Sequence, residues 1–165
     1  MIVGLPCAGK STYATALQID TNAVLVSLDR WLITLFGRYS IGEIGHEEHV
    51  RRVLSTRALI WESSSEHLRR SVDVILDDGF FLREHRRRHG ELATALGAAS
   101  TIHFIDAPVH VLRSRISARN ADLPAHNFRI DPEMLDVFVR MFERPSTDEG
   151  AALVNRNSWR EAPVS

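Results

Sequence analysis

Residues 4–11 read GLPCAGKS and fit the pattern GxxxxGK(S/T) at every fixed position. This pattern is typical of a phosphate-binding loop that connects a strand to a helix. Residues 1–3 are apolar and residues 10–19 carry apolar side chains at helical spacing, so both neighbouring elements are expected. The pattern therefore predicts an α/β fold in which a parallel strand leads into this loop.

The chemistry of the loop predicts a nucleoside triphosphate as its ligand. Gly4 and Gly9 allow backbone N–H groups to point at phosphate oxygens, and the following helix adds the positive end of its dipole. Lys10 supplies a charge for the β- and γ-phosphates, and the Ser11 hydroxyl suits a Mg²⁺ ion. The alternative is an ordinary glycine-containing turn before a helix. We expect contacts to ATP from Gly4, Leu5, Pro6, Cys7, Ala8, Gly9, Lys10, Ser11 and Thr12.

The length of 165 residues and the composition favour one soluble globular domain. The formal net charge of -1 gives no overall field that attracts nucleic acid or membranes, although a locally basic groove stays open. Cys7 is the single cysteine, which fits a reducing, intracellular setting. We expect a cytoplasmic protein, because the chain shows neither a membrane-spanning apolar run nor a signal peptide.

Apolar segments separated by helical patterns predict the rest of the sheet. Together with the loop they indicate a three-layer P-loop NTPase fold, with a five-stranded parallel sheet, helices on both faces and a short lid. The predicted strands after residues 1–3 are 23–27, 72–76, 101–105 and 151–154, and the predicted helices after the first are 30–36, 46–70, 83–96, a helix after Pro108, and 132–142.

Acidic residues follow two of these strands. Ligands bind at the carboxyl ends of strands in an open α/β sheet, so such acids face the same crevice as the loop. Asp29 is a candidate general base, and the alternative is an N-cap for the next helix. Asp77 is a candidate for the Mg²⁺ shell, whereas Asp78 with Gly79 suits a turn.

The segment from residue 37 to 70 predicts a loop and then a long helix. Residues 37–45 contain three glycines and read as a mobile surface loop near the site. Residues 46–70 have helical periodicity, and their apolar stripe is expected to pack on the sheet. The stripe consists of Val50, Val53, Leu54, Ala58 and Trp61.

Two basic patterns occur later in the chain. The run at residues 85–89 is either a solvated helix face or a surface for a phosphate-bearing substrate. Arg115 and Arg119 stand one helical turn apart before a polar segment, which predicts a lid at about residues 115–131 that brings positive charge to the transferred phosphoryl group. The alternative is a pair of surface arginines. Residues 1–155 are predicted to form a single domain and residues 156–165 a tail.

The sequence resembles the small P-loop kinases of the AAA-type ATP-binding family, which includes polynucleotide kinase, chloramphenicol phosphotransferase, gluconate kinase and zeta-toxin-like enzymes. The segments that carry the resemblance cover most of the chain. They are residues 4–12, 26–29 and 74–78, residues 105–108 with Arg115 and Arg119, and residues 142–145 leading to 148–150.

The resemblance implies ATP- and Mg²⁺-dependent transfer of the γ-phosphoryl group to a hydroxyl, with Asp29 as general base and with Arg115 and Arg119 as lid arginines. The acids at 77–78 followed by Phe80 and Phe81 look closer to the antibiotic phosphotransferase than to polynucleotide kinase. A small-molecule acceptor is therefore favoured. A polynucleotide 5′-hydroxyl kinase and a non-catalytic nucleotide-binding regulator are the alternatives.

Overall fold

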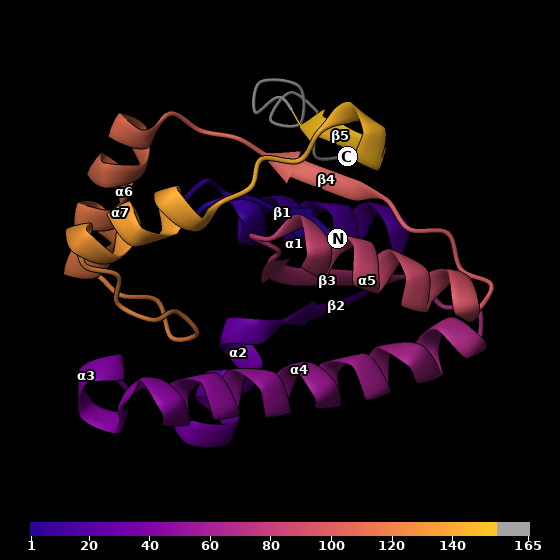
Figure 1. Cartoon of the computed structure of the whole chain (residues 1–165), viewed down its shortest axis with the longest axis horizontal. Coiled ribbons are helices and arrows are strands. Elements are labelled where there is room, and N and C mark those ends of the chain that lie inside the picture. The colour runs from indigo at the N-terminus through magenta and orange to yellow at the C-terminus, as the bar shows by residue number, and fades with distance from the viewer. Residues whose placement is uncertain (155–165) are drawn as a thin grey trace.

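The computed structural model describes residues 1–154, so residue 155 and the predicted tail lie outside it. Five strands form one parallel sheet in the order β2-β3-β1-β4-β5, which confirms the predicted sheet (Figure 1). Within these residues, no helix is both long and apolar enough to cross a membrane. The strands are β1 (Ile2–Val3), β2 (Val24–Ser27), β3 (Val74–Gly79), β4 (Ile102–Ile105) and β5 (Ala151–Val154).

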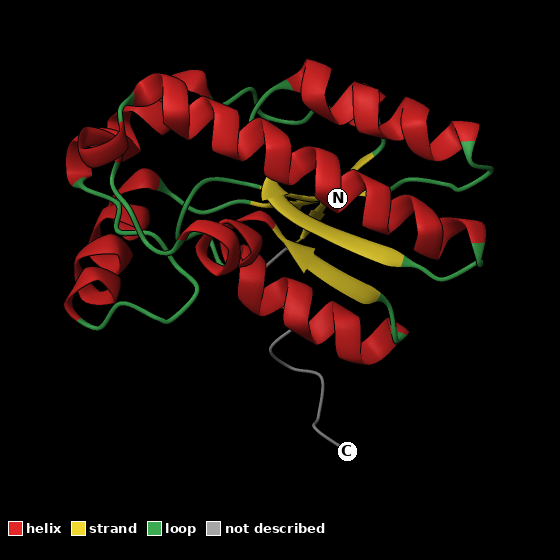
Figure 2. Cartoon of the chain, turned by 90° about the horizontal axis from the view of Figure 1, so that it is seen from below, coloured by secondary structure: helices red, strands yellow, loops and turns green. Residues whose placement is uncertain are grey.

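Helices connect the parallel strands and cover both faces of the sheet, as Figure 2 shows from below. Successive residues of a strand point to opposite faces, so Ile75 and Leu76 of β3 belong to two different cores. The helices are α1 (Lys10–Thr21), α2 (Leu28–Phe36), α3 (Ile41–Ile44), α4 (His46–Arg69), α5 (Arg83–Ala95), α6 (Val109–Ala121), α7 (Pro132–Met141) and the short 3₁₀ helix η1 (Thr147–Glu149).

The two cores lie on opposite faces of the sheet. One core packs α1, α6 and α7 against Ile2, Ile75 and Ile105. The other packs α2 and α4 against Val3, Leu76 and Phe104 on the opposite face. The carboxyl ends of β1, β2 and β3 therefore emerge between the two helical layers, where the phosphate loop and the acidic residues follow them.

The prediction of a loop over residues 37–45 is wrong in part, because α3 occupies Ile41–Ile44. A capping box stabilises this short helix: the Glu43 N–H donates to Ser40 Oγ, and the Ser40 N–H donates to the Glu43 carboxylate. The Ser-x-x-Glu spacing is present in the sequence, but the three glycines of the segment favoured a loop.

The predicted apolar stripe of α4 is wrong in part, because Val53 packs against a core of the sheet but other members do not. Val50 and Leu54 are 38% and 59% exposed, and the buried residues of α4 are Thr56, Ile60, Ser64 and Ser65. Thr56 and Ser64 are small, which lets the helix lie close to its neighbours. The face that packs is therefore chosen by side-chain size as well as by hydrophobicity.

Candidate active site

The phosphate loop is wedged between the ends of β3 and β4. Gly4 has φ +150°, and a Cβ there would lie 2.4 Å from the carbonyl oxygen of Ile105. The Gly4 N–H donates to the Gly79 carbonyl at 3.2 Å. Glycine is therefore required at position 4 because neighbouring backbone approaches it closely. The predicted nucleotide contacts at residues 4–12 all lie in this loop and in the first turn of α1.

The first turn of α1 presents backbone donors without internal partners. The helix begins at Lys10 after Gly9, which has φ +109° and offers no side-chain cap. The N–H of Tyr13 is bonded to the Gly9 carbonyl, whereas the N–H groups of the three preceding residues precede the first helical hydrogen bond. An uncapped helix start with a glycine-bearing loop fits phosphate oxygens.

Lys10 lies at the centre of the charges in this cleft. Its Nζ donates to the Leu5 carbonyl at 2.9 Å. Burial lowers the pKa of Lys10, while the negative charges of Asp77 and Asp29 oppose that shift. Lys10 is therefore close enough to both predicted acids to interact with them electrostatically.

Ser11 and Asp77, which were both predicted to serve the metal ion, are brought together. The Ser11 hydroxyl donates to Asp77 Oδ2 at 2.8 Å, and Asp77 is 8% exposed. The parallel register pairs Asp77 with Ile2, which places it beside the loop. Oxygen donors of this kind suit Mg²⁺, which commonly takes only one or two protein ligands. Within residues 1–154 there is no group of three or more His, Cys, Asp or Glu side chains that suits a metal.

Asp29 lies in the first turn of α2. That helix begins at Leu28 after Ser27, so the alternative interpretation of Asp29 as an N-cap is wrong. Burial raises the pKa of Asp29 to about 6, and the charge of Lys10 opposes this shift. The neighbouring negative charge of Asp77 raises it further. A carboxylate of this kind changes protonation state close to neutral pH.

Asp78 does not form the predicted turn. It belongs to β3, and its two carboxylate oxygens accept hydrogen bonds from Nε and Nη2 of Arg57, each at 2.7 Å. Burial raises the pKa of Asp78, and the charge of Arg57 opposes that rise. Sequence reasoning missed Arg57, because nothing in its helical neighbourhood distinguishes it from the other arginines of α4.

Arg115 and Arg119 both lie in α6, but they have different partners. Arg115 Nη1 donates to the carbonyls of Cys7 and Ala8 at 3.1 and 3.3 Å, so it holds the phosphate loop. Arg119 Nη2 donates to the Phe128 carbonyl at 3.2 Å. The buried Nε of Arg119 has no hydrogen-bond partner within the described residues. An orphaned cationic donor fits an oxygen of a bound phosphate.

The lid segment after α6 touches the segment between α2 and α3. Arg38 Nη2 donates to the Pro124 carbonyl at 2.6 Å and reaches the Leu123 carbonyl at 3.4 Å. The rings of Tyr39 and Phe128 meet edge to face with their centroids 5.0 Å apart. Two segments far apart in the sequence therefore close over the same end of the sheet.

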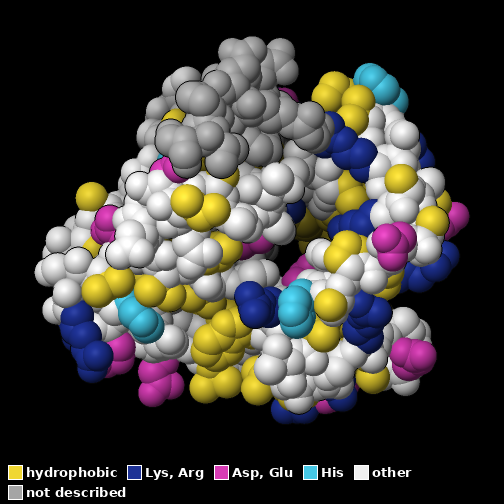
Figure 3. Space-filling model, turned by 180° about the vertical axis from the view of Figure 1, so that it is seen from behind, with side chains coloured by type: hydrophobic (Ala, Val, Ile, Leu, Met, Phe, Trp, Pro, Cys, Tyr) yellow, Lys and Arg dark blue, Asp and Glu magenta, His cyan; other side chains and the backbone are white. Residues whose placement is uncertain are grey.

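The hollow that these elements surround is visible on the face opposite to that of Figure 1. Figure 3 shows it on the side of the molecule that carries α2, α3, α6 and α7. Lys and Arg side chains border the hollow, and acidic side chains lie near its middle. This arrangement matches a cleft that holds charged groups of both signs.

The basic run of α5 contains one arginine, Arg86, that is used inside the protein, whereas Arg87 and Arg88 stay exposed. The side chain of Arg86 is fully buried and pairs with Glu149 at 2.7 Å, and it also donates to the carbonyls of Phe80 and Glu143. Arg87 pairs with Glu84 and Glu91. Arg86 therefore fits neither interpretation of the run, since it is neither solvated nor available to a substrate.

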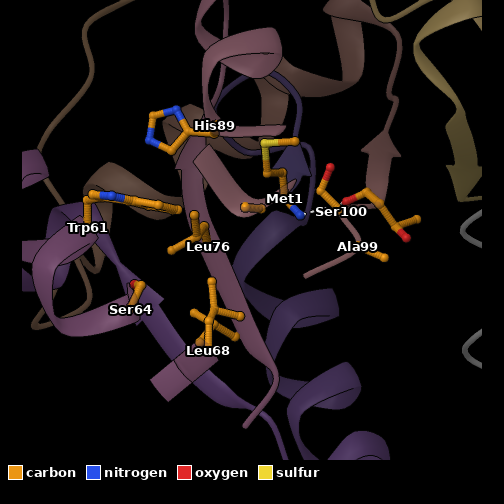
Figure 4. A pocket seen from close by; sticks show the side chains of 11 residues that line it. Met1, Trp61, Ser64, Leu68, Leu76, His89, Ala99 and Ser100 are labelled. Atoms are coloured by element: carbon orange, nitrogen blue, oxygen red, sulfur yellow. Dashed lines mark hydrogen bonds between the residues drawn. The ribbon is translucent and has the colours of Figure 1, made fainter. Parts of the chain in front are cut away.

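A second cavity lies between α4 and α5, at the opposite end of the sheet. It measures about 80 Å³, and its lining includes Met1, Val74 and Thr101, which precede or begin their strands. Figure 4 shows Trp61 and Leu68 of α4 on one side of it. This cavity is separate from the phosphate loop, which follows the carboxyl end of β1.

Comparisons with known proteins agree with this geometry. The family model described as AAA domain matches residues 1–145. A candidate kinase from Chloroflexus aurantiacus is 21% identical with a TM-score of 0.70, covering 93% of this chain and 83% of that one. Kti12 of Chaetomium thermophilum, solved with ADP-AlF3, is 18% identical with a TM-score of 0.67, covering 97% and 92%. A gluconokinase from Sinorhizobium meliloti is 16% identical with a TM-score of 0.62, covering 93% and 79%.

Among curated protein sequences, none matches the chain significantly. At identities of this size, the likeness to the solved structures shows that the fold is shared. The match to the AAA domain spans the phosphate loop, the sheet up to β4 and the lid arginines.

Proposed function

Because the chain belongs to the AAA domain family, we propose that it is an ATP-dependent kinase that phosphorylates a hydroxyl of a small molecule. Structural neighbours that carry kinase names support this proposal at the level of the reaction class. The observation that carries it is Asp29, a buried acid with a pKa of about 6 that shares its surroundings with Lys10 and Asp77.

The nucleotide would be held by the phosphate loop. The N–H groups at the start of α1 and the charge of Lys10 would bind the β- and γ-phosphates, and Arg115 would keep the loop in shape through the carbonyls of Cys7 and Ala8. A Mg²⁺ ion at Ser11 and Asp77 would neutralise charge on the phosphate oxygens.

The transfer step would take place between Asp29 and Arg119. Asp29 would accept the proton of the acceptor hydroxyl while the oxygen of that hydroxyl bonds to the γ-phosphorus. The bond from that phosphorus to the oxygen that bridges it to the β-phosphate would break, which releases ADP. The unpaired Nε of Arg119 would donate to an equatorial phosphate oxygen as charge develops there.

A small-molecule acceptor is preferred to a polynucleotide because arginines of the basic run in α5 are buried or form ion pairs. Arg86 is buried, and Arg83 and Arg87 form ion pairs with acidic residues of the chain. A track for the phosphates of a nucleic acid needs basic side chains that are free to exchange counterions. The interpretation of this run as such a track therefore loses Arg86, and the exposed Arg83 and Arg87 would have to give up their ion pairs to serve it.

A labelling experiment tests the proposal. Candidate hydroxyl compounds and 5′-hydroxyl oligonucleotides are incubated with γ-labelled ATP and Mg²⁺, and transfer is compared between the wild type and Asp29→Asn. We expect labelled small-molecule product that Asp29→Asn fails to form. Labelled oligonucleotide would redirect the proposal to a polynucleotide kinase. ATP binding without any labelled acceptor across a broad screen would favour a regulatory protein instead.

A further inference from the structure

Arg57 has an unusual position among the arginines of the cleft. Its guanidinium is fixed along one edge, because Nε and Nη2 both donate to the carboxylate of Asp78. An arginine has five N–H donors, and Nη1 forms no hydrogen bond within residues 1–154. The side chain of Asp78 is 9% exposed and that of Arg57 is 31% exposed. The buried acid therefore holds the arginine, whose side chain is partly exposed and whose Nη1 keeps its donors.

The pair lies beside the residues proposed for catalysis. Asp78 directly follows Asp77, and its charge contributes to the raised pKa of Asp29. Asp77 and Asp78 point to opposite faces of β3, so Asp77 serves the side of α1 and Asp78 the side of α4. Arg57 is thus placed on the α4 side of the end of β3, where its partner Asp78 is one of the charges that act on Asp29, the proposed general base.

The other groups near Arg57 do not neutralise its open end. Burial together with the charge of Arg57 lowers the pKa of His85 to about 3, and the same two causes contribute to a lowered pKa of His49. His89, which also lies near Arg57, has its pKa lowered mainly by burial. These imidazoles are therefore neutral at pH 7. Among the described residues, Asp78 is the one acid that forms an ion pair with Arg57.

The neighbouring arginines of α4 are already occupied. Arg51 and Arg52 share the carboxylate of Glu48. Arg52 also lies over the rings of Phe36 and Tyr39, 4.9 and 4.8 Å from their centroids. The guanidinium of Arg52 is therefore covered by two rings, whereas among the described residues no ring lies against that of Arg57.

A buried ion pair contributes little to stability, since desolvation of the two charges offsets their attraction. A fixed guanidinium is nevertheless well suited to recognition. One edge is oriented by a protein carboxylate, and the other edge offers parallel N–H donors to a carboxylate or phosphate of a ligand. Asp78 is then a positioning residue for Arg57.

We propose that Arg57 forms a binding subsite for an anionic group, a carboxylate or a phosphate, carried by the acceptor molecule near its reacting hydroxyl. This inference rests on the proposed function, because it assigns the substrate class of the same site. It excludes neutral alcohols and unmodified sugars as preferred substrates.

The test uses pairs of acceptors that differ in one charge. One pair is a hydroxy acid and its amide, and a second pair is a sugar phosphate and the free sugar. Binding to the ADP-loaded protein is measured by calorimetry, and labelled transfer from ATP gives KM and kcat separately. The two pairs distinguish a carboxylate from a phosphate. The binding arm does not need turnover, so a failure of the proposed function and a failure of this inference give different results.

Three variants are compared with the wild type. Arg57→Gln removes the charge, and Arg57→Gln combined with Asp78→Asn also removes the buried acid that would otherwise lose its partner. Arg51→Gln is the matched control, because Arg51 is an arginine of the same helix whose side chain is 62% exposed. Nucleotide affinity of each variant is measured with ADP alone.

In the wild type, we expect the charged member of one pair to bind about 10- to 100-fold more tightly than its neutral counterpart. The double variant should lose this preference through a higher KM, with unchanged affinity for ADP, and Arg51→Gln should keep it. Equal binding of charged and neutral members to the wild type would overturn the inference, and so would a preference that survives in the double variant. If the protein prefers the charged member in binding but transfers no phosphate to it, the result would support the subsite and contradict the proposed kinase activity.

Discussion

The two sides of the cleft are built in different ways. The side proposed for the nucleotide consists of residues 4–9 and the helix α1 that follows them, with Asp77 added from β3. The side proposed for the acceptor combines Asp29 of α2, Tyr39, Arg57 of α4 and Asp78 of β3. Nucleotide binding is therefore encoded in a local motif, whereas acceptor selection depends on contacts between distant elements.

The two sides also differ in their free donors. The nucleotide side keeps uncapped N–H groups and the orphaned Nε of Arg119, which suits a ligand with several charges. On the side proposed for the acceptor, Arg57 and Arg52 are paired with Asp78 and Glu48, and Nη1 of Arg57 forms no hydrogen bond among the described residues. This difference is the one expected for a multiply charged donor and for the proposed acceptor with one anionic group.

The largest effect is expected on the nucleotide side. Lys10→Ala removes the charge that faces the β- and γ-phosphates, so kcat/KM should fall by roughly 10³-fold or more. The affinity for ATP should fall as well, as measured by titration with a fluorescent analogue. Arg51→Gln serves as the exposed control and should bind nucleotide normally. Normal turnover by Lys10→Ala would refute the assignment of this loop as the donor site.

The lid arginines should separate into two roles. Arg119→Met should lower kcat by about 10²- to 10³-fold with little change in ATP affinity, because its free donor is used as charge develops on the phosphoryl group. Arg115→Met should instead weaken ATP binding, because Arg115 holds the loop carbonyls. Steady-state kinetics and equilibrium binding check this difference. Identical defects in the two variants would show that they act as one unit.

A smaller effect concerns stability and pH. Because the folded protein raises the pKa of Asp29 from 3.8 to about 6, the folded state binds its proton more tightly than the unfolded chain. The associated stability is present below about pH 4 and is lost as the pH rises through 6. Nucleotide-free Asp29→Asn should therefore be more stable than the wild type by about 2 kcal/mol at pH 8.

This stability difference should shrink toward zero at pH 4. Urea unfolding of both proteins between pH 4 and 8 measures it, and a difference that does not change with pH would contradict the buried charge of Asp29.

The smallest effect is expected at the contact between the lid and the acceptor side. Arg38→Met removes the donors to the carbonyls of Leu123 and Pro124, so the lid should close less completely. The KM for the acceptor should rise about 3- to 5-fold, because a solvent-exposed contact contributes about 1 kcal/mol or less. ATP affinity in a titration should not change. A larger loss of ATP affinity than of acceptor affinity would show that this contact serves the nucleotide side of the cleft instead.

The difference between the two sides of the cleft also explains which features could be predicted from the sequence. The loop pattern and the apolar segments predicted the sheet. Ser11 follows the loop after β1, and Asp77 lies near the carboxyl end of a parallel strand, which was enough to expect both at the same edge of the sheet. These features are local or follow from the rules of parallel sheets. Asp29 was placed near the loop for the same reason, although its own helix began earlier than predicted.

The rest depended on tertiary packing. Arg57 reaches Asp78 over 21 positions of sequence, and Arg86 reaches Glu149 over 63. Such partners depend on which side of a helix packs, and the apolar spacing of α4 included Val53, which packs, together with the exposed Val50 and Leu54. Sequence patterns therefore describe the donor site better than the acceptor site.

The most direct test of the account is the pH dependence of phosphoryl transfer in the wild type and Asp29→Asn, with ADP affinity measured in parallel. The account predicts a wild-type rate that falls as the pH drops below about 6, when Asp29 becomes protonated. It predicts a rate about 10²- to 10⁴-fold lower in the variant, at unchanged ADP affinity. A variant that transfers phosphate at the wild-type rate would contradict the central claim.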